Sequence, residues 1–76
     1  MYPLELIKWV DHTGFNEWKT LAEVKEIDLI IIETVGWIVN ETPDAVVIVS
    51  TLEVDGERCH SDFCIYKPAI LSRQVL

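Results

Sequence analysis

Basic residues are scarce in this 76-residue chain. It has 6 lysines and arginines against 13 aspartates and glutamates, which gives a formal net charge of −7. The basic residues are scattered along the sequence: Lys8, Lys19, Lys25, Arg58, Lys67 and Arg73. Proteins bind nucleic acid by placing clustered lysine and arginine against phosphates. The composition therefore disfavours a nucleic-acid partner and, for the same reason, an anionic membrane surface.

The sequence also lacks a long apolar run. The longest, LIII at 29–32, is far shorter than the roughly 20 residues that a membrane-spanning helix needs. The stretch MYPLELIKWV at 1–10 contains Glu5 and Lys8 and has no small-residue cleavage site, so it is not the pattern of a signal peptide. We therefore expect a soluble cytoplasmic protein without a membrane partner, and the length predicts one domain over residues 1–76.

Cysteine is rare as well, with Cys59 and Cys64 alone. Two cysteines five positions apart in a strand-like segment point to opposite faces, so we expect no disulfide between them. A structural zinc site needs four ligands, and Cys59, His60 and Cys64 supply three at poor spacing. We interpret both cysteines as small, half-buried hydrophobic residues and predict neither a metal nor a cofactor.

Apolar sequence is abundant, because half of the residues are hydrophobic. Turn residues such as Pro43 and the Asp-Gly pair at 55–56 divide it into strand-like stretches. The expected strands cover residues 4–12, 27–40, 45–53, 57–66 and 71–76. A helix is expected within residues 15–26, where Thr20 and Glu23 have the spacing of a capping box. So short a helix is unstable alone, so we expect it to lie on the sheet.

Gly36 stands inside the longest of these strands, residues 27–40. Glycine weakens a strand interior unless the backbone must bend there or approach another group closely. This stretch is too long for one straight strand in so small a domain, so we place a bend or bulge at Gly36. The prediction is a mainly β fold with one short helix, in which five strands close into a small SH3-like or Sm-like barrel. The turn KPAI at 67–70 before a short last strand is typical of how such barrels end.

Several of these stretches resemble a family of small proteins from tailed bacteriophages and prophages. The matching segments cover nearly the whole chain: WVD at 9–11, Trp18, VGWIVNE at 35–41, DAVVIV at 44–49 and IYKPAIL at 65–71. The family usually has Ile-Pro-Lys at the late turn, where this chain has YKPA at 66–69. The resemblance implies a barrel and a phage-encoded accessory protein that acts in the cytoplasm of the infected bacterium. Its motifs are structural and imply no activity.

Five residues form the candidate interaction surface: Trp9, Asp11, His12, Trp18 and Trp37. Indole rings can line a pocket or stack on a planar ligand, and they can equally fill the core of a small barrel, which we favour for Trp37. An Asp–His pair such as Asp11 and His12 can transfer protons when a nucleophile is near. Adjacent strand residues point to opposite faces, however, and no nucleophile motif surrounds this pair. We therefore predict that the protein is not an enzyme.

Two functions remain open. Acidic residues gather at 23–33 and 53–57, and such a surface can dock on a basic host or phage protein by charge complementarity. Alternatively, the tryptophans could hold a small nucleotide-like ligand between subunits. In both cases we expect a homo-oligomer, because strands 4–12 and 27–40 carry apolar residues on both faces and one short helix cannot cover them.

Replacing the two cysteines together, Cys59→Ser with Cys64→Ser, should leave the fold and the zinc content of the purified protein unchanged. The reason is the lack of a fourth ligand and the poor spacing of the other three. Elemental analysis of the wild type and thermal denaturation of the variant check this expectation. Stoichiometric zinc in the wild type would contradict it.

Overall fold

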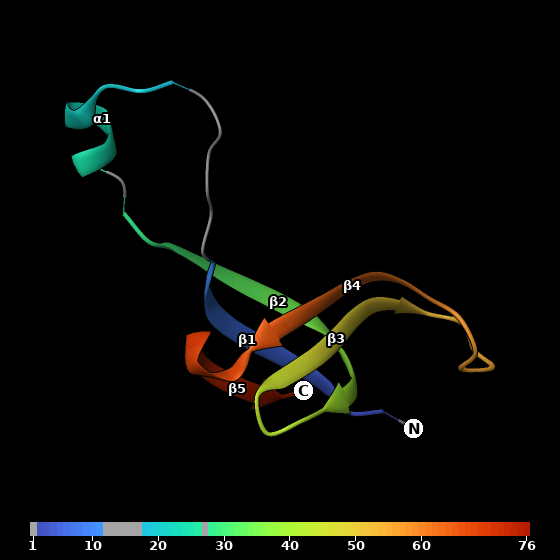
Figure 1. The fold of residues 1–76 in the computed structure, drawn as a ribbon. Coiled ribbons are helices and arrows are strands. Elements are labelled where there is room, and N and C mark those ends of the chain that lie inside the picture. The colour runs from blue at the N-terminus through green and yellow to red at the C-terminus, as the bar shows by residue number, and fades with distance from the viewer. Residues whose placement is uncertain (1, 12–17, 27) are drawn as a thin grey trace.

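The computed structural model describes residues 2–11, 18–26 and 28–76. In chain order its elements are β1 (Leu4–Asp11), α1 (Leu21–Lys25), β2 (Ile30–Glu41), β3 (Ala45–Leu52), β4 (Cys59–Tyr66), the 3₁₀ helix η1 (Lys67–Ala69) and β5 (Ile70–Val75), as Figure 1 shows. The prediction of a mainly β chain with one short helix and five strands is confirmed. Within these residues, no helix has the length and apolar character needed to cross a membrane.

The five strands form one antiparallel sheet in the order β4-β3-β2-β1-β5. This sheet curls strongly. In a flat sheet, β4 and β1 would lie about 14 Å apart, three strand spacings. The ring centroids of Phe63 on β4 and Trp9 on β1 are nevertheless 6.2 Å apart. The β3–β4 hairpin therefore folds over one face of β1 and β2.

The sheet is not closed into the predicted barrel. In the part of the chain that the structure describes, β4 and β5 are the two edges and do not pair with each other. Closure requires the outer edges of these strands to meet. One edge of β5 pairs with β1 along Glu5–Trp9, and its other edge does not meet β4. The β3–β4 hairpin extends away from the β1–β5 pair toward the 53–58 loop (Figure 1).

The buried core lies between the β3–β4 hairpin and the face of β1 and β2 over which this hairpin folds. Four strands contribute to it: Ile7, Ile38, Val46, Ile48 and Ile65. The half-buried Trp9 and Ile70 pack against these residues. Strand alternation puts Ile7 and Trp9 on this face of β1, and Leu6 and Val10 on the opposite face. Each fully buried aliphatic side chain stabilises the fold by about 1.5–3 kcal/mol relative to exposure.

Helix α1 is short, as predicted, but it does not lie on the sheet. Of the predicted range, residues 15–17 fall outside the described part of the chain, and the helix itself covers Leu21–Lys25. Thr20 caps it as predicted, because the Glu23 backbone N–H donates to Thr20 Oγ1 at 3.2 Å. None of the helix residues is buried, and Figure 1 shows α1 away from the sheet. A five-residue helix offers too little apolar area to cover a sheet face.

Gly36 is needed for a close approach and not for the bulge that we placed there. The register of β2 against β3 shifts between Ile38 and Asn40, so the irregularity lies beyond Gly36. Gly36 itself is buried. A Cβ atom at this position would overlap the Val49 carbonyl oxygen and lie 2.9 Å from Ile48 Cγ1. The glycine therefore lets β3 pass directly against β2, and close approach of two backbones is the reason for a glycine inside this strand.

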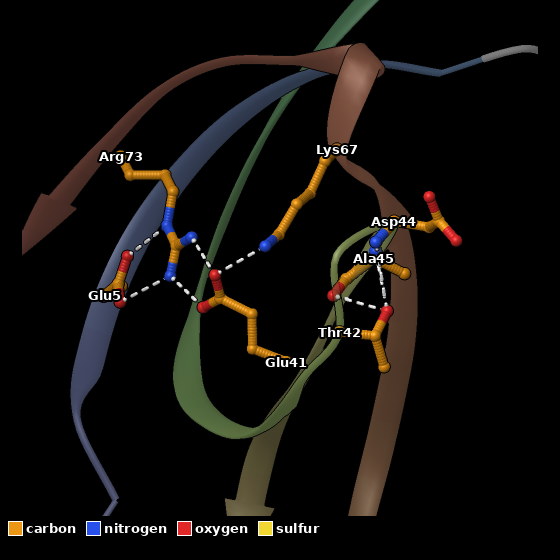
Figure 2. Close-up of polar contacts among 7 residues, drawn as sticks. All are labelled: Glu5, Glu41, Thr42, Asp44, Ala45, Lys67 and Arg73. Carbon is orange, nitrogen blue, oxygen red and sulfur yellow. Dashed lines mark hydrogen bonds and ion pairs between the residues drawn. The ribbon is translucent and has the colours of Figure 1, made fainter.

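Thr42 organises the turn between β2 and β3. Its Oγ1 accepts hydrogen bonds from the backbone N–H groups of Asp44, at 3.2 Å, and Ala45, at 3.0 Å (Figure 2). The Thr42 backbone N–H in turn donates to the Ala45 carbonyl at 2.9 Å. Short hydroxyl side chains commonly close turns in this way. The turn expected at Pro43 is therefore present, but β2 runs on to Glu41 before it.

Four charged side chains connect β1, β2, η1 and β5 at one end of the sheet (Figure 2). The Arg73 guanidinium donates to both carboxylate oxygens of Glu5, at 2.8 and 3.0 Å, and to both of Glu41, at 3.2 and 2.9 Å. Lys67 Nζ lies 2.8 Å from the Glu41 carboxylate. Glu5 is only 6% exposed, and a buried carboxylate is tolerated when it is paired and hydrogen-bonded in this manner.

These contacts shift two ionisation equilibria. Hydrogen bonds from Arg73 and then Lys67 lower the pKa of the Glu41 carboxyl from 4.5 to about 2. Hydrogen bonds to Glu5 and then Glu41 raise the pKa of Arg73. Both pKa changes favour the charged forms, because each charged group is hydrogen-bonded to a group of opposite charge. Glu41 and Arg73 are therefore ionised throughout the neutral range.

Gly36→Val should destabilise the protein by about 1–3 kcal/mol, because its side chain has no room beside Val49 and Ile48 and must displace β3. Chemical denaturation of both proteins measures the difference. Gly56→Ala is the control: a Cβ there meets nothing within 4 Å, and only the positive φ of 77° opposes it, at roughly 1 kcal/mol. Equal unfolding midpoints for Gly36→Val and the wild type would show that β2 and β3 are not this close.

Acid should remove the stabilisation that comes from ionised Glu41. The carboxyl has a lower pKa in the folded state than in the unfolded state, so its contribution is complete above pH 4.5 and is lost as the pH falls toward about 2. In Glu41→Gln, the free energy of unfolding should fall less over this window than in the wild type. Urea denaturation at successive pH values measures this free energy. Glu26→Gln, at the end of α1, is the control for the loss of one charge. Parallel curves for Glu41→Gln and the wild type would contradict the assignment.

Candidate functional site

The described members of the predicted interaction surface, Trp9, Asp11, Trp18 and Trp37, do not all come together. Trp9 and Trp37 lie on opposite faces of the sheet. Trp9 pairs with Ile32 of β2 and shares its face, and Trp37 lies five positions after Ile32. An odd spacing along a strand puts two side chains on opposite faces. Trp18 belongs to the segment that leads into α1. The three tryptophans therefore do not lie on one surface of the described chain.

Trp9 is part of the packing around the core. Its indole Nε1–H donates to Thr34 Oγ1 on β2 at 2.9 Å, and its ring meets Phe63 at an interplanar angle of 57°. A half-buried indole with its single donor satisfied and its ring tilted against a second aromatic is a stabilising arrangement. Trp9 therefore connects β1 to both β2 and β4.

The Asp11–His12 pair is only half described. Asp11 is the last residue of β1, half-buried and opposite Ile30 of β2. His12 lies outside the described residues. The residue that faces Asp11 across the strands is aliphatic, so it offers no group for proton transfer.

Trp37 borders an open pocket of about 400 Å³ on the face opposite to the core. The lining comes from three places along the chain, namely the segment before β1, the middle of β2, and the end of β3 with the loop after it: Tyr2, Trp37, Leu52, Glu53, Val54, Asp55 and Gly56. Trp37 is half-buried and Tyr2 is exposed. The core role that we favoured for Trp37 is therefore incomplete, because this indole also forms a pocket wall.

The loop from 53 to 58 has a defined conformation. Its ends are joined where the Glu53 N–H donates to the Arg58 carbonyl at 2.9 Å. Gly56 adopts a φ of 77°, which favours glycine, and the Glu57 N–H donates to Asp55 Oδ1 at 3.0 Å. The Asp-Gly turn predicted here is thus present. It brings two acidic residues, Glu53 and Asp55, into the lining of the pocket, and we call these two residues its rim.

The rim already binds one cation of the chain itself. Arg58 Nε lies 2.7 Å from Glu53 Oε1, and the Arg58 side chain is 83% exposed. An exposed ion pair of this kind is worth little, about 0–1 kcal/mol, so an incoming cation can replace it. Two aromatic side chains beside two carboxylates form a site for a positively charged group.

Both cysteines are free and exposed. The interpretation of Cys59 and Cys64 as half-buried hydrophobic residues is therefore wrong, because β4 is an edge strand and its burial pattern is exposed everywhere except at Ile65. Among the residues that the structure describes, no group of three or more His, Cys, Asp or Glu side chains could hold a metal ion.

Sequence reasoning missed Tyr2, Glu53 and Asp55 as site residues. The acidic cluster at 53–57 and the Asp-Gly turn were both visible, but the pairing of β2 with β3 was needed to bring them to Trp37. Comparison of the chain with models of protein families, with curated proteins and with solved structures finds no match. The site is therefore defined by its geometry alone.

Proposed function

We propose that this chain is a phage-encoded accessory protein that acts by binding a host or phage protein in the bacterial cytoplasm, and not by catalysis. The phage origin rests on the resemblance of segments such as VGWIVNE at 35–41 and DAVVIV at 44–49 to the phage family. We also propose that the open sheet is a variant of the SH3-like or Sm-like type. The position of β1 between β2 and β5, and the 3₁₀ turn η1 before β5, support this assignment.

The pocket at Trp37 is the observation that carries the proposal. Its lining includes two aromatic residues, Tyr2 and Trp37, and the two acidic rim residues, Glu53 and Asp55. A lysine or arginine side chain satisfies both features, by contact with an aromatic face and by an ion pair. The net charge of −7 adds a long-range attraction toward a basic partner. We therefore propose that the partner inserts a basic side chain into this pocket.

A small ligand is the second candidate, because the pocket volume of about 400 Å³ falls in the range of small-molecule sites. The rim carboxylates repel phosphate groups, so a nucleoside or a cationic aromatic compound fits this pocket better than a nucleotide does. Such a ligand would stack on Trp37.

The two candidates are separated by titrating the protein with short peptides while observing the Trp37 indole N–H by NMR. A peptide with one central arginine should shift this resonance, and the same peptide with citrulline should not, because citrulline keeps the shape and loses the charge. Glu53→Gln with Asp55→Asn should weaken the arginine response on the order of tenfold, since two rim charges are removed. Nucleosides form a third arm of the titration.

Three results would count against basic side-chain recognition: equal responses to arginine and citrulline, no response to either peptide, or an arginine response that survives loss of both carboxylates. A response to nucleosides alone would favour the small-ligand candidate. Leu71→Ala, at an exposed position on β5 outside the pocket, is the control variant and should bind the arginine peptide as the wild type does.

A further inference from the structure

Residues 18–26, hereafter the arm, present apolar side chains with no cover from the rest of the described chain. Trp18 is fully exposed, Leu21 is 77% exposed and Val24 is 47% exposed. The three follow one another at intervals of three residues, which places Leu21 and Val24 on one side of α1. A helix of five residues is not stable by itself in water and needs a surface to pack on.

The outer face of the β1–β2 pair is a surface of that kind. We define it by residues that are paired across the two strands and lie opposite the core face: Leu6 with Val35, Lys8 with Glu33, and Val10 with Ile31. Ile31 is 59% exposed and Val35 is 49% exposed. The outer face therefore consists of two apolar pairs with one pair of opposite charges, Lys8 and Glu33, between them. The arm is likewise neutral overall, because it carries two glutamates and two lysines beside its apolar side chains: Glu23, Glu26, Lys19 and Lys25.

The isolated chain exposes more surface than a folded monomer of its size. A compact protein of 8.7 kDa exposes about 4,700 Å², whereas this chain exposes 6039 Å². Its radius of gyration is 15.4 Å, where a compact 76-residue chain has about 11 Å. The excess area, about 1,300 Å², is more than the roughly 800 Å² that each partner contributes to a standard interface.

We propose that two copies of the chain exchange their arms, so that Trp18, Leu21 and Val24 of each copy pack on the outer face of the other. A second copy is the occupant that these observations favour, because each chain carries one largely exposed apolar arm and one partly exposed apolar face. The arm of a given copy stands away from its own sheet (Figure 1). In this exchange the dimer contains two identical contacts, each between the arm of one copy and the outer face of the other. Such an arrangement is closed and has two-fold symmetry. The proposal does not depend on the pocket at Trp37.

Light scattering behind a size-exclusion column tests the stoichiometry. The wild type should have twice the chain mass of 8.7 kDa across a wide concentration range. Leu21→Asp in the arm and Val35→Lys on the outer face should each weaken the dimer on the order of a hundredfold, because each loses a buried aliphatic contact twice. Asp at the first helical position favours the helix, so the first variant tests contact and not helix formation. Val54→Asp, at a fully exposed loop position, is the control and should remain a dimer.

Mixing the two variants gives the decisive measurement. Leu21→Asp keeps an intact outer face and Val35→Lys keeps an intact arm, so one arm–face contact is restored in the mixture, and a heterodimer should form. A monomeric wild type, a Leu21→Asp protein that remains dimeric, or a mixture that stays monomeric would each overturn the proposal. NMR spectra of each variant show that it is folded, and Leu21→Gln with Val35→Thr replaces the pair if either is not.

Discussion

The fold depends on one antiparallel sheet curling over its own concave face. Ile7 on β1, Ile38 on β2, and Val46, Ile48 and Ile65 on the β3–β4 hairpin meet there in a single apolar layer. Gly36 permits the curl at its tightest point, because β3 passes against β2 where any side chain would collide with the Val49 carbonyl. Trp9 and Phe63 then connect strands that lie three positions apart in the sheet. A chain of this length has enough residues for one such layer and no second one.

The cluster of Glu5, Glu41, Lys67 and Arg73 lies at one end of this apolar layer. It is a consequence of the layer, because the layer buries a charged residue. Glu5 shares its face of β1 with Ile7, so its carboxylate is buried with the core and requires a partner. Arg73 supplies that partner from β5 and also binds Glu41 at the end of β2. Lys67 brings η1 to the same Glu41 carboxylate. The cluster thus fixes the last strand on the first, where burial alone would not specify the register.

The curl leaves two surfaces uncovered, the pocket at Trp37 and the outer face of the β1–β2 pair. The two surfaces adjoin on the same face of β2, since Val35 of the outer face lies two residues before Trp37 of the pocket. The pocket is aromatic with a carboxylate rim, and the outer face is mostly aliphatic. The two proposed interactions, with a basic partner and with a second copy of the chain, therefore use neighbouring surfaces of different chemistry.

The sequence by itself determined the strands, their turns and the helix cap. Alternating and β-branched residues, the Asp-Gly turn at 55–56 and the Thr20–Glu23 spacing are local signals, and each element lies close to its expected place. The two-sided apolar character of β1 and β2 was equally visible, because strand alternation assigns Ile7 and Leu6 to opposite faces without further information.

Only the tertiary structure decided how those elements meet. The side of β1 that becomes the core, the close passage of Val49 past Gly36, and the meeting of Tyr2, Trp37 and Asp55 in one pocket all depend on the register of strands that are far apart in sequence. Burial of Glu5 beside Arg73 joins residues 68 positions apart, and no local pattern marks either as a partner of the other. Local propensity specifies elements, whereas register and curl come from packing the whole sheet at once, and the site forms where that packing ends.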